Sequence, residues 1–240
     1  MSYFLLYVCI LSIFIVTKAY YNVSNENWSE PFYSGTNNKT YVLLGDSILQ
    51  NDIYVSDGQS VKEHILERNK QVYSFAKDHS KVVDIFGQIS NIPLEFNSPD
   101  TFIFLSGGGN DILFHYVEQP QNDNDNNDNN DNNDNNDNND KLYTIFDNYV
   151  KVVKSIQARL PEAKIVLLDI YYPNNDTYKQ YHSIIEKWNE MIYDFANNPE
   201  NNIYDTIQIS KLLTQTNDFS NKIEPSTNGG KKIATYICKF

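Results

Sequence analysis

Short apolar segments alternate with longer amphipathic segments along this chain of 240 residues, and this alternation restricts the folds open to it. Three apolar runs, at 40–44, 101–105 and 164–170, are rich in β-branched and aliphatic residues and are flanked by turn residues. Two further candidates lie at 72–75 and 203–209. Short runs that are apolar throughout are typical of strands covered on both faces.

Helical patterns fill the chain between and after these runs. Apolar residues recur at three- and four-residue spacings over 142–160, where Pro161 follows as a stop, and again over 181–195. A last helix is predicted to start at 225–227. Strands that alternate with helices indicate an α/β protein with a parallel sheet covered by helices.

One low-complexity segment carries most of the negative charge. Residues 122–140 contain seven aspartates and no cation, whereas the formal net charge of the whole chain is −12. A segment of this composition cannot bury a core, so we expect a disordered loop over 121–140 inside one domain. It lacks the glycine of an EF-hand loop, which makes calcium binding the less favoured alternative. No basic stripe exists elsewhere, which argues against a nucleic-acid partner.

The first residues of the chain resemble a targeting segment. The apolar run at 4–16 is too short to span a bilayer comfortably, and small residues flank Lys18. We expect a signal peptide over 1–19 and an N-terminal extension over 20–39, with no membrane span left after cleavage. The protein would then be secreted or lie in an endomembrane or lysosomal lumen. A buried N-terminal strand and an uncleaved anchor are the alternatives.

Cysteine usage and glycosylation sequons fit that expectation. The two cysteines are Cys9 and Cys238, so cleavage leaves Cys238 alone, without an internal disulfide or a cysteine metal site. Acceptor sequons for N-glycosylation begin at the following asparagines: Asn22, Asn27, Asn38 and Asn175.

Two polar motifs follow two of the predicted strands. Ser47 stands in "GDS" after the run at 40–44, and Asn110 follows Ser106 and three glycines after the run at 101–105. Sites in parallel sheets form at the carboxyl ends of strands, so both side chains are expected in one crevice. A serine hydrolase needs a nucleophile, a base and donors for the oxyanion, and Ser47 and Asn110 are candidates for the first and last of these.

These motifs resemble the blocks of the SGNH, or GDSL, hydrolase family. Residues 45–47 are similar to its first block, residues 75–85 to its second and residues 108–111, which include Gly108, to its third. The resemblance implies a three-layer α/β/α, flavodoxin-like domain over 40–240, without a metal or an organic cofactor. It also implies an ester hydrolase with Ser47 as nucleophile. Its oxyanion hole would be formed by the Ser47 N–H, the N–H at the second-block glycine position and the Asn110 amide.

Two blocks depart from the family pattern. His79 occupies the second-block glycine position, and Asn221 and Glu224 stand where the last block has Asp and His. The string around Glu224 resembles a branch of the family in which Glu-Pro-Ser replaces His-Pro-Ser. Glu224 is therefore the first candidate for the base, and His79 is the alternative. Asp218 is a candidate supporting carboxylate.

Two functions of different classes follow. The first is a secreted esterase or lipase-type hydrolase that acts on small-molecule, lipid or sugar esters. The alternative is a catalytically inactive binding module of the same fold for an acyl or carbohydrate ligand. The retained oxyanion donors favour the enzyme, while the missing Asp and His favour the binding module. A structural secreted protein would explain the Asn/Asp repeat but not the blocks.

Overall fold

Five strands form the central sheet of this protein. The computed structural model describes residues 39–68, 70–117 and 131–240. The strands of the main sheet are β1 (Thr40–Leu44), β2 (Gln71–Ser74), β3 (Thr101–Leu105), β4 (Lys164–Leu168) and β5 (Asp205–Ile207). Two shorter strands, β6 (Phe219–Ser220) and β7 (Glu224–Pro225), pair with each other as an antiparallel hairpin.

The main sheet is parallel throughout, with the strand order β2-β1-β3-β4-β5. In its centre, Val42 of β1 lies opposite Tyr73 of β2 on one side and Ile103 of β3 on the other. This order is that of flavodoxin-like sheets, in which the chain changes direction across the sheet between β1 and β3.

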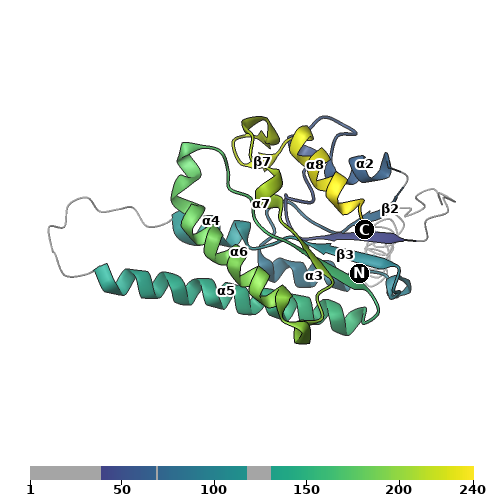
Figure 1. The fold of residues 1–240 in the computed structure, drawn as a ribbon, viewed down its shortest axis with the longest axis horizontal. Coiled ribbons are helices and arrows are strands. Elements are labelled where there is room, and N and C mark those ends of the chain that lie inside the picture. The colour runs from purple at the N-terminus through teal and green to yellow at the C-terminus, as the bar shows by residue number, and fades with distance from the viewer. Residues whose placement is uncertain (1–38, 69, 118–130) are drawn as a thin grey trace, which may run out of the picture. The chain divides into compact units, whose positions relative to one another are not determined.

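Helices cover both faces of this sheet (Figure 1). Their bounds are α2 (Val61–Leu66), α3 (Ile85–Ser90), α4 (Gly109–Val117), α5 (Asp131–Arg159), α6 (His182–Asn197), α7 (Ile209–Leu212) and α8 (Thr227–Ile237). The core on one face is shared with α3, α4, α5 and α6, and the core on the other with α2, α7 and α8. The predicted three-layer α/β/α fold is therefore confirmed.

The strands contribute to the two cores in turn. In β1, Val42 and Leu44 belong to the core beneath α5, while Tyr41 and Leu43 belong to the core beneath α8. Successive side chains of a strand point to opposite faces, so a strand between two helical layers must be apolar at every position. This is why the central strands appear in the sequence as uninterrupted apolar runs.

Helix α5 begins earlier than the amphipathic pattern of the sequence predicts. Residues 131–140, the second half of the Asn/Asp repeat, form its first turns, where we expected a loop. Helix propagation costs less than nucleation, and the packed segment 142–159 supplies the nucleus. Aspartates near a helix N-terminus also interact favourably with its dipole. Ten residues of the expected loop are thus helical, and the other ten, 121–130, lie outside the described residues.

The predicted signal peptide and nearly all of the N-terminal extension also lie outside the described residues. None of the helices in the described ranges combines the length and the apolar character needed to cross a bilayer. Within the same ranges, no three His, Cys, Asp or Glu side chains are grouped so that they could hold a metal ion.

Candidate active site

The candidate site lies where the sheet changes direction. Strands β1 and β3 are neighbours, and the chain leaves them toward opposite edges of the sheet. The loops after their carboxyl ends therefore separate and leave a crevice between them, which is where ligands bind in open α/β sheets. Ser47 lies in the loop after β1, and Asn110 lies at the start of α4, after β3.

The loop that carries Ser47 is held tightly at Gly45. This residue has a φ of +127°, and a Cβ atom there would lie 2.2 Å from the Ser106 carbonyl oxygen, so only glycine fits. The buried Gln88 amide accepts from the Gly45 N–H at 2.8 Å and donates to the Gly45 carbonyl at 2.7 Å. The chain then forms a helical turn in which the Leu49 and Gln50 N–H groups donate to the Asp46 carbonyl.

Asp46 stabilises the same turn from inside. Its carboxylate accepts from the Ile48 N–H at 3.1 Å and from the Ser106 hydroxyl at 2.9 Å. Burial raises the pKa of Asp46 to about 6, although these hydrogen bonds oppose the shift. These contacts give Asp46 a structural role, since they hold the turn that carries Ser47.

The glycine loop after β3 brings Asn110 to the crevice. Gly108 has a φ of +100°, and a Cβ atom there would lie 2.2 Å from the Trp188 ring of α6. Gly108 therefore supports the site by letting the loop pass close to α6 rather than by contacting a substrate. The Asn110 amide donates to the Ser80 carbonyl at 3.0 Å, and because the amide carries two hydrogens, one remains for a ligand.

The second-block residue His79 is placed differently from the expectation. Its backbone is left-handed, with a φ of +59°, which is a conformation that suits the glycine of the family pattern. Its N–H, however, donates to the Asp78 carboxylate at 2.9 Å and is therefore occupied. Its side chain is 79% exposed, lies 3.3 Å from Asp78 and does not line the cavity. The described geometry thus offers His79 neither as an oxyanion donor nor as a base.

The last block forms the hairpin β6–β7, and Asn221 belongs to its turn. Asn221 and Lys222 both have a positive φ, and the Ile223 N–H donates to the Ser220 carbonyl at 3.2 Å. Asparagine adopts the left-handed conformation more readily than most residues. The exposed Asn221 side chain lies outside the cavity, so it does not orient Glu224 as an acid would at this position.

Asp218 is also directed away from the cavity. Its buried carboxylate accepts from the Thr214 and Gln215 N–H groups, both at 3.0 Å, and from Asn228 of α8. It also forms a 2.7 Å ion pair with Lys232. These contacts hold the pKa of Asp218 below its ordinary value despite burial. The supporting role expected for Asp218 is therefore structural: it anchors α8 to the preceding loop.

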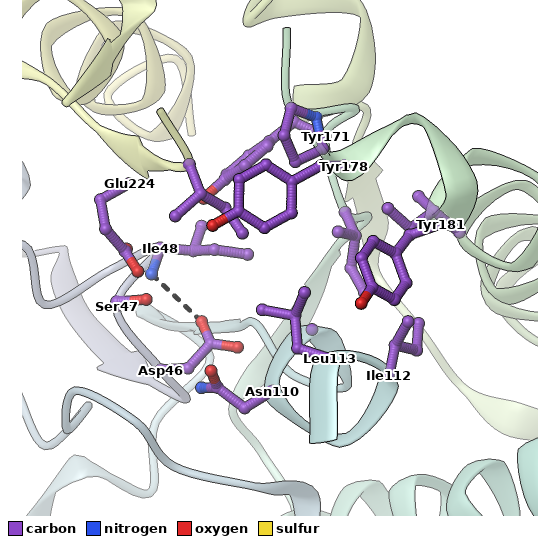
Figure 2. A pocket seen from close by; sticks show the side chains of 15 residues that line it. Asp46, Ser47, Ile48, Asn110, Ile112, Leu113, Tyr171, Tyr178, Tyr181 and Glu224 are labelled. Atoms are coloured by element: carbon purple, nitrogen blue, oxygen red, sulfur yellow. Dashed lines mark hydrogen bonds between the residues drawn. The ribbon is translucent and has the colours of Figure 1, made fainter. Parts of the chain in front are cut away.

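One cavity brings Ser47, Asn110 and Glu224 together (Figure 2). The Ser47 hydroxyl and the Glu224 carboxylate face each other at one side, with Asp46 and Asn110 beside them. The space between the lining residues is about 500 Å³, which includes the part open to solvent. The rest of the wall is apolar or aromatic and consists of Ile48, Gly109, Ile112, Leu113, Ile170, Tyr171, Pro173, Tyr178, Tyr181, Ile185 and Ile223.

The Glu224 carboxylate lies opposite the Ser47 hydroxyl at the polar end of the cavity (Figure 2). Burial, together with the negative charges of Asp46 and Asp78, raises the pKa of Glu224 from 4.5 to about 6, while the nearby Ser47 hydroxyl and His79 oppose the shift. One carboxylate oxygen, Oε2, is buried without a hydrogen-bond partner in the described part of the chain. A partly buried carboxylate with this pKa that faces a serine hydroxyl can remove its proton near neutral pH.

The Ser47 N–H is available as a second donor at the crevice, because it donates to no acceptor among the described residues. It lies on the helical turn after β1, where backbone N–H groups point outward and can hold an anion. Together with the second hydrogen of the Asn110 amide, it gives two donors beside the nucleophile. Sequence reasoning missed Gln88 and the three cavity tyrosines because no local motif marks them.

No protein-family model and no curated protein matches this sequence. Solved structures do match its fold. A member of the lipolytic G-D-S-L family from Veillonella parvula is 17% identical, with a TM-score of 0.59 over 84% of this chain and 97% of that one. A lipase from a goat rumen metagenome is also 17% identical, with a TM-score of 0.63 over 84% of this chain and 96% of that one.

An acetylxylan esterase from Geobacillus stearothermophilus, Axe2, is 13% identical, with a TM-score of 0.55 over 85% of this chain and 94% of that one. Identities this low show the fold alone. The chain has the fold of the SGNH/GDSL hydrolases, and the resemblance predicted from its motifs is confirmed at that level.

Proposed function

We propose that this protein, which has the SGNH/GDSL hydrolase fold, hydrolyses acyl esters with Ser47 as its nucleophile and Glu224 as its general base. The observation that carries the proposal is that the Ser47 hydroxyl and the Glu224 carboxylate face each other inside a cavity that Asn110 also lines. A nucleophile, a base with a matched pKa and an oxyanion donor are the parts that acyl transfer requires.

In the first step, the Ser47 oxygen attacks the ester carbonyl carbon while its proton passes to Glu224. The carbonyl oxygen becomes an oxyanion, which accepts hydrogen bonds from the Ser47 N–H and the Asn110 amide. Glu224 becomes neutral as the oxyanion forms, so the negative charge moves within the site and its total is unchanged. A pKa of about 6 leaves Glu224 mostly ionised at pH 7 and more basic than an ordinary glutamate.

In the second step, the tetrahedral intermediate collapses and expels the alcohol, which takes the proton from Glu224. A water molecule then attacks the acyl-serine, with Glu224 as its base, and releases the acid and the free Ser47 hydroxyl. The third oxyanion donor of the family pattern, the His79 N–H, contributes only if it leaves Asp78, so the proposal needs two donors rather than three.

The cavity wall supports a neutral ester with an apolar group. Within the described chain, Asp46 and Glu224 are the only carboxylates that line it and no Lys, Arg or His does, while Ile112, Leu113 and Tyr181 form its apolar side. Structural neighbours include a lipase and an acetylxylan esterase, so lipid and sugar esters are both retained as substrate classes. Secretion, or residence in an endomembrane or lysosomal lumen, remains part of the proposal.

The second candidate function is a catalytically inactive binding module for an acyl or carbohydrate ligand. Two observations favour it: the His79 N–H is occupied by Asp78, and Asn221 leaves Glu224 without an orienting acid. A binding module keeps the cavity and its polar end but does not turn over an ester.

Labelling with a fluorophosphonate probe separates the two functions. We expect the purified protein to be labelled at Ser47 and to hydrolyse p-nitrophenyl acyl esters, and we expect Ser47→Ala to lose both reactions. A folded protein that is not labelled and hydrolyses none of a panel of acyl, lipid and acetyl-sugar esters contradicts the enzyme. Binding of the same esters without turnover then supports the binding module.

A further inference from the structure

A buried asparagine connects the loop of Ser47 to the strand of Glu224. Asn51 is completely buried, and its amide nitrogen donates to the Pro225 carbonyl at 3.0 Å. Its amide oxygen accepts from the Val61 N–H, the first of α2, at 2.9 Å. One partner is an acceptor and the other a donor, so both bonds form in only one orientation of the amide.

The position of Asn51 links the two reacting side chains by a short path. It lies four residues after Ser47, directly beyond the helical turn that presents the nucleophile, and its partner Pro225 directly follows Glu224. Helix α8 packs closely against this link: a Cβ atom at Gly230 would lie 3.2 Å from the Asn51 amide nitrogen. The space around the amide is therefore filled, and the link has little freedom to shift.

We propose that Asn51 is a positioning residue that holds the Glu224 carboxylate on the Ser47 hydroxyl. The inference rests on the proposed function, because it assumes that Glu224 is the base. In the family pattern a carboxylate three residues before the base orients it. Here Asn221 lies at that position in an exposed turn, so the base needs another support. Asn51 supplies this support by donating a hydrogen bond to the carbonyl of Pro225, the residue directly after Glu224.

A double-mutant cycle tests whether Asn51 acts through Glu224. The rate of fluorophosphonate labelling of Ser47 is measured in wild type, Asn51→Ala, Glu224→Gln and the double variant. Displacing a base by about 1 Å costs roughly 100-fold, so we expect Asn51→Ala to slow labelling about 10- to 100-fold in the wild-type background. In the Glu224→Gln background we expect less than about a twofold further loss, because the group that Asn51 positions is already gone.

Two further variants keep the test decisive if Asn51→Ala is unstable. Asn51→Asp still accepts from the Val61 N–H but, when ionised, cannot donate to the Pro225 carbonyl, so it breaks the link to Glu224 and keeps the bond to α2. Asn189→Ala is the matched control. Asn189 is equally buried, and its amide bonds the Ile170 N–H and carbonyl, both at 2.8 Å. Its effect on labelling should be the same in both backgrounds.

An equal loss from Asn51→Ala in both backgrounds overturns the positioning role, since Asn51 would then act on the fold or on the Ser47 loop alone. Unchanged labelling in folded Asn51→Ala and Asn51→Asp overturns it as well. If Glu224→Gln alone is labelled as fast as wild type, the proposed base is wrong, and that result is obtained without any Asn51 variant.

Discussion

Glu224→Gln should make the protein less active and more stable at the same time. The substitution keeps the shape of the side chain but removes a proton acceptor, so ester hydrolysis should fall by about 10²- to 10⁴-fold. It also removes a partly buried charge. In the folded protein, burial and the nearby carboxylates of Asp46 and Asp78 raise the pKa of Glu224 above its ordinary value. The ionised carboxylate therefore destabilises the fold.

The size of this destabilisation follows from the pKa. The value rises from 4.5 to about 6, which at about 1.4 kcal/mol per pKa unit corresponds to roughly 2 kcal/mol. Glu224 is only partly buried, and solvent screening reduces the expected effect to about 1 kcal/mol. Because the folded state binds the extra proton, the cost is absent below pH 4.5, develops as the pH rises from 4.5 to about 6, and is complete at pH 7.

Urea denaturation of wild type and Glu224→Gln at pH 4 and pH 8 measures the effect. At each pH, the unfolding free energy of wild type is subtracted from that of the variant. We expect this difference to be about 1 kcal/mol larger at pH 8 than at pH 4. Comparing the two pH values cancels any change in packing, which is the same at both. If this difference is the same at pH 8 as at pH 4, or smaller, the argument that the fold raises the pKa of Glu224 is refuted.

The activity profile alone would not identify the base. A carboxylate with a pKa of about 6 gives an acidic limb close to that of an ordinary histidine, whose pKa is about 6.5. The sign of the stability change is therefore the better criterion, since His79 is largely exposed and its replacement removes no buried charge.

Four further outcomes are expected. Asn110→Ala should lower kcat roughly 100-fold with little change in KM in steady-state kinetics, as for other oxyanion donors; an unchanged kcat contradicts that role. Deleting residues 122–130 should leave the thermal unfolding midpoint nearly unchanged, because such a segment contributes no core and long loops cost little to close; a large drop contradicts this. N-terminal sequencing of protein from its own cells should start near Tyr20, and an intact N-terminus argues against cleavage. Adding Asn221→Asp to Glu224→His should restore no activity in ester hydrolysis over Glu224→His alone, since residue 221 lies in an exposed turn; a clear gain contradicts that placement.

The sheet was predictable because burial on both faces dictates the residue at every strand position. The predicted runs at 40–44 and 101–105 coincide with β1 and β3. The run at 164–170 ends earlier, at Leu168, because the Ile170 N–H bonds the Asn189 side chain instead of a neighbouring strand. Whether the Ile170 N–H bonds a neighbouring strand or a side chain depends on Asn189 of α6. The local sequence pattern around residue 170 cannot show this.

The candidate site was predictable only where its parts end strands. Ser47 and Asn110 follow β1 and β3, and topology alone brings such positions to one crevice. The supports of the site come from far along the chain: Gln88 reaches Gly45 across 43 positions, and Asn51 reaches Pro225 across 174. Glutamine and asparagine occur throughout this sequence, so nothing local distinguishes these two from the others.

The two changes in the last block are chemically consistent with each other. A histidine base becomes a cation when it takes the serine proton, and the family's aspartate stabilises that cation and fixes its orientation. A glutamate base becomes neutral, so it needs no counter-charge, and residue 221 is free to serve the hairpin turn. What a glutamate does need is a higher pKa, and burial beside Asp46 and Asp78 provides it. Removing either neighbouring charge would lower that pKa and weaken the base. In the proposed mechanism, the function of the orienting position is divided between the carboxylates that raise the pKa of Glu224 and the Asn51 amide that positions it.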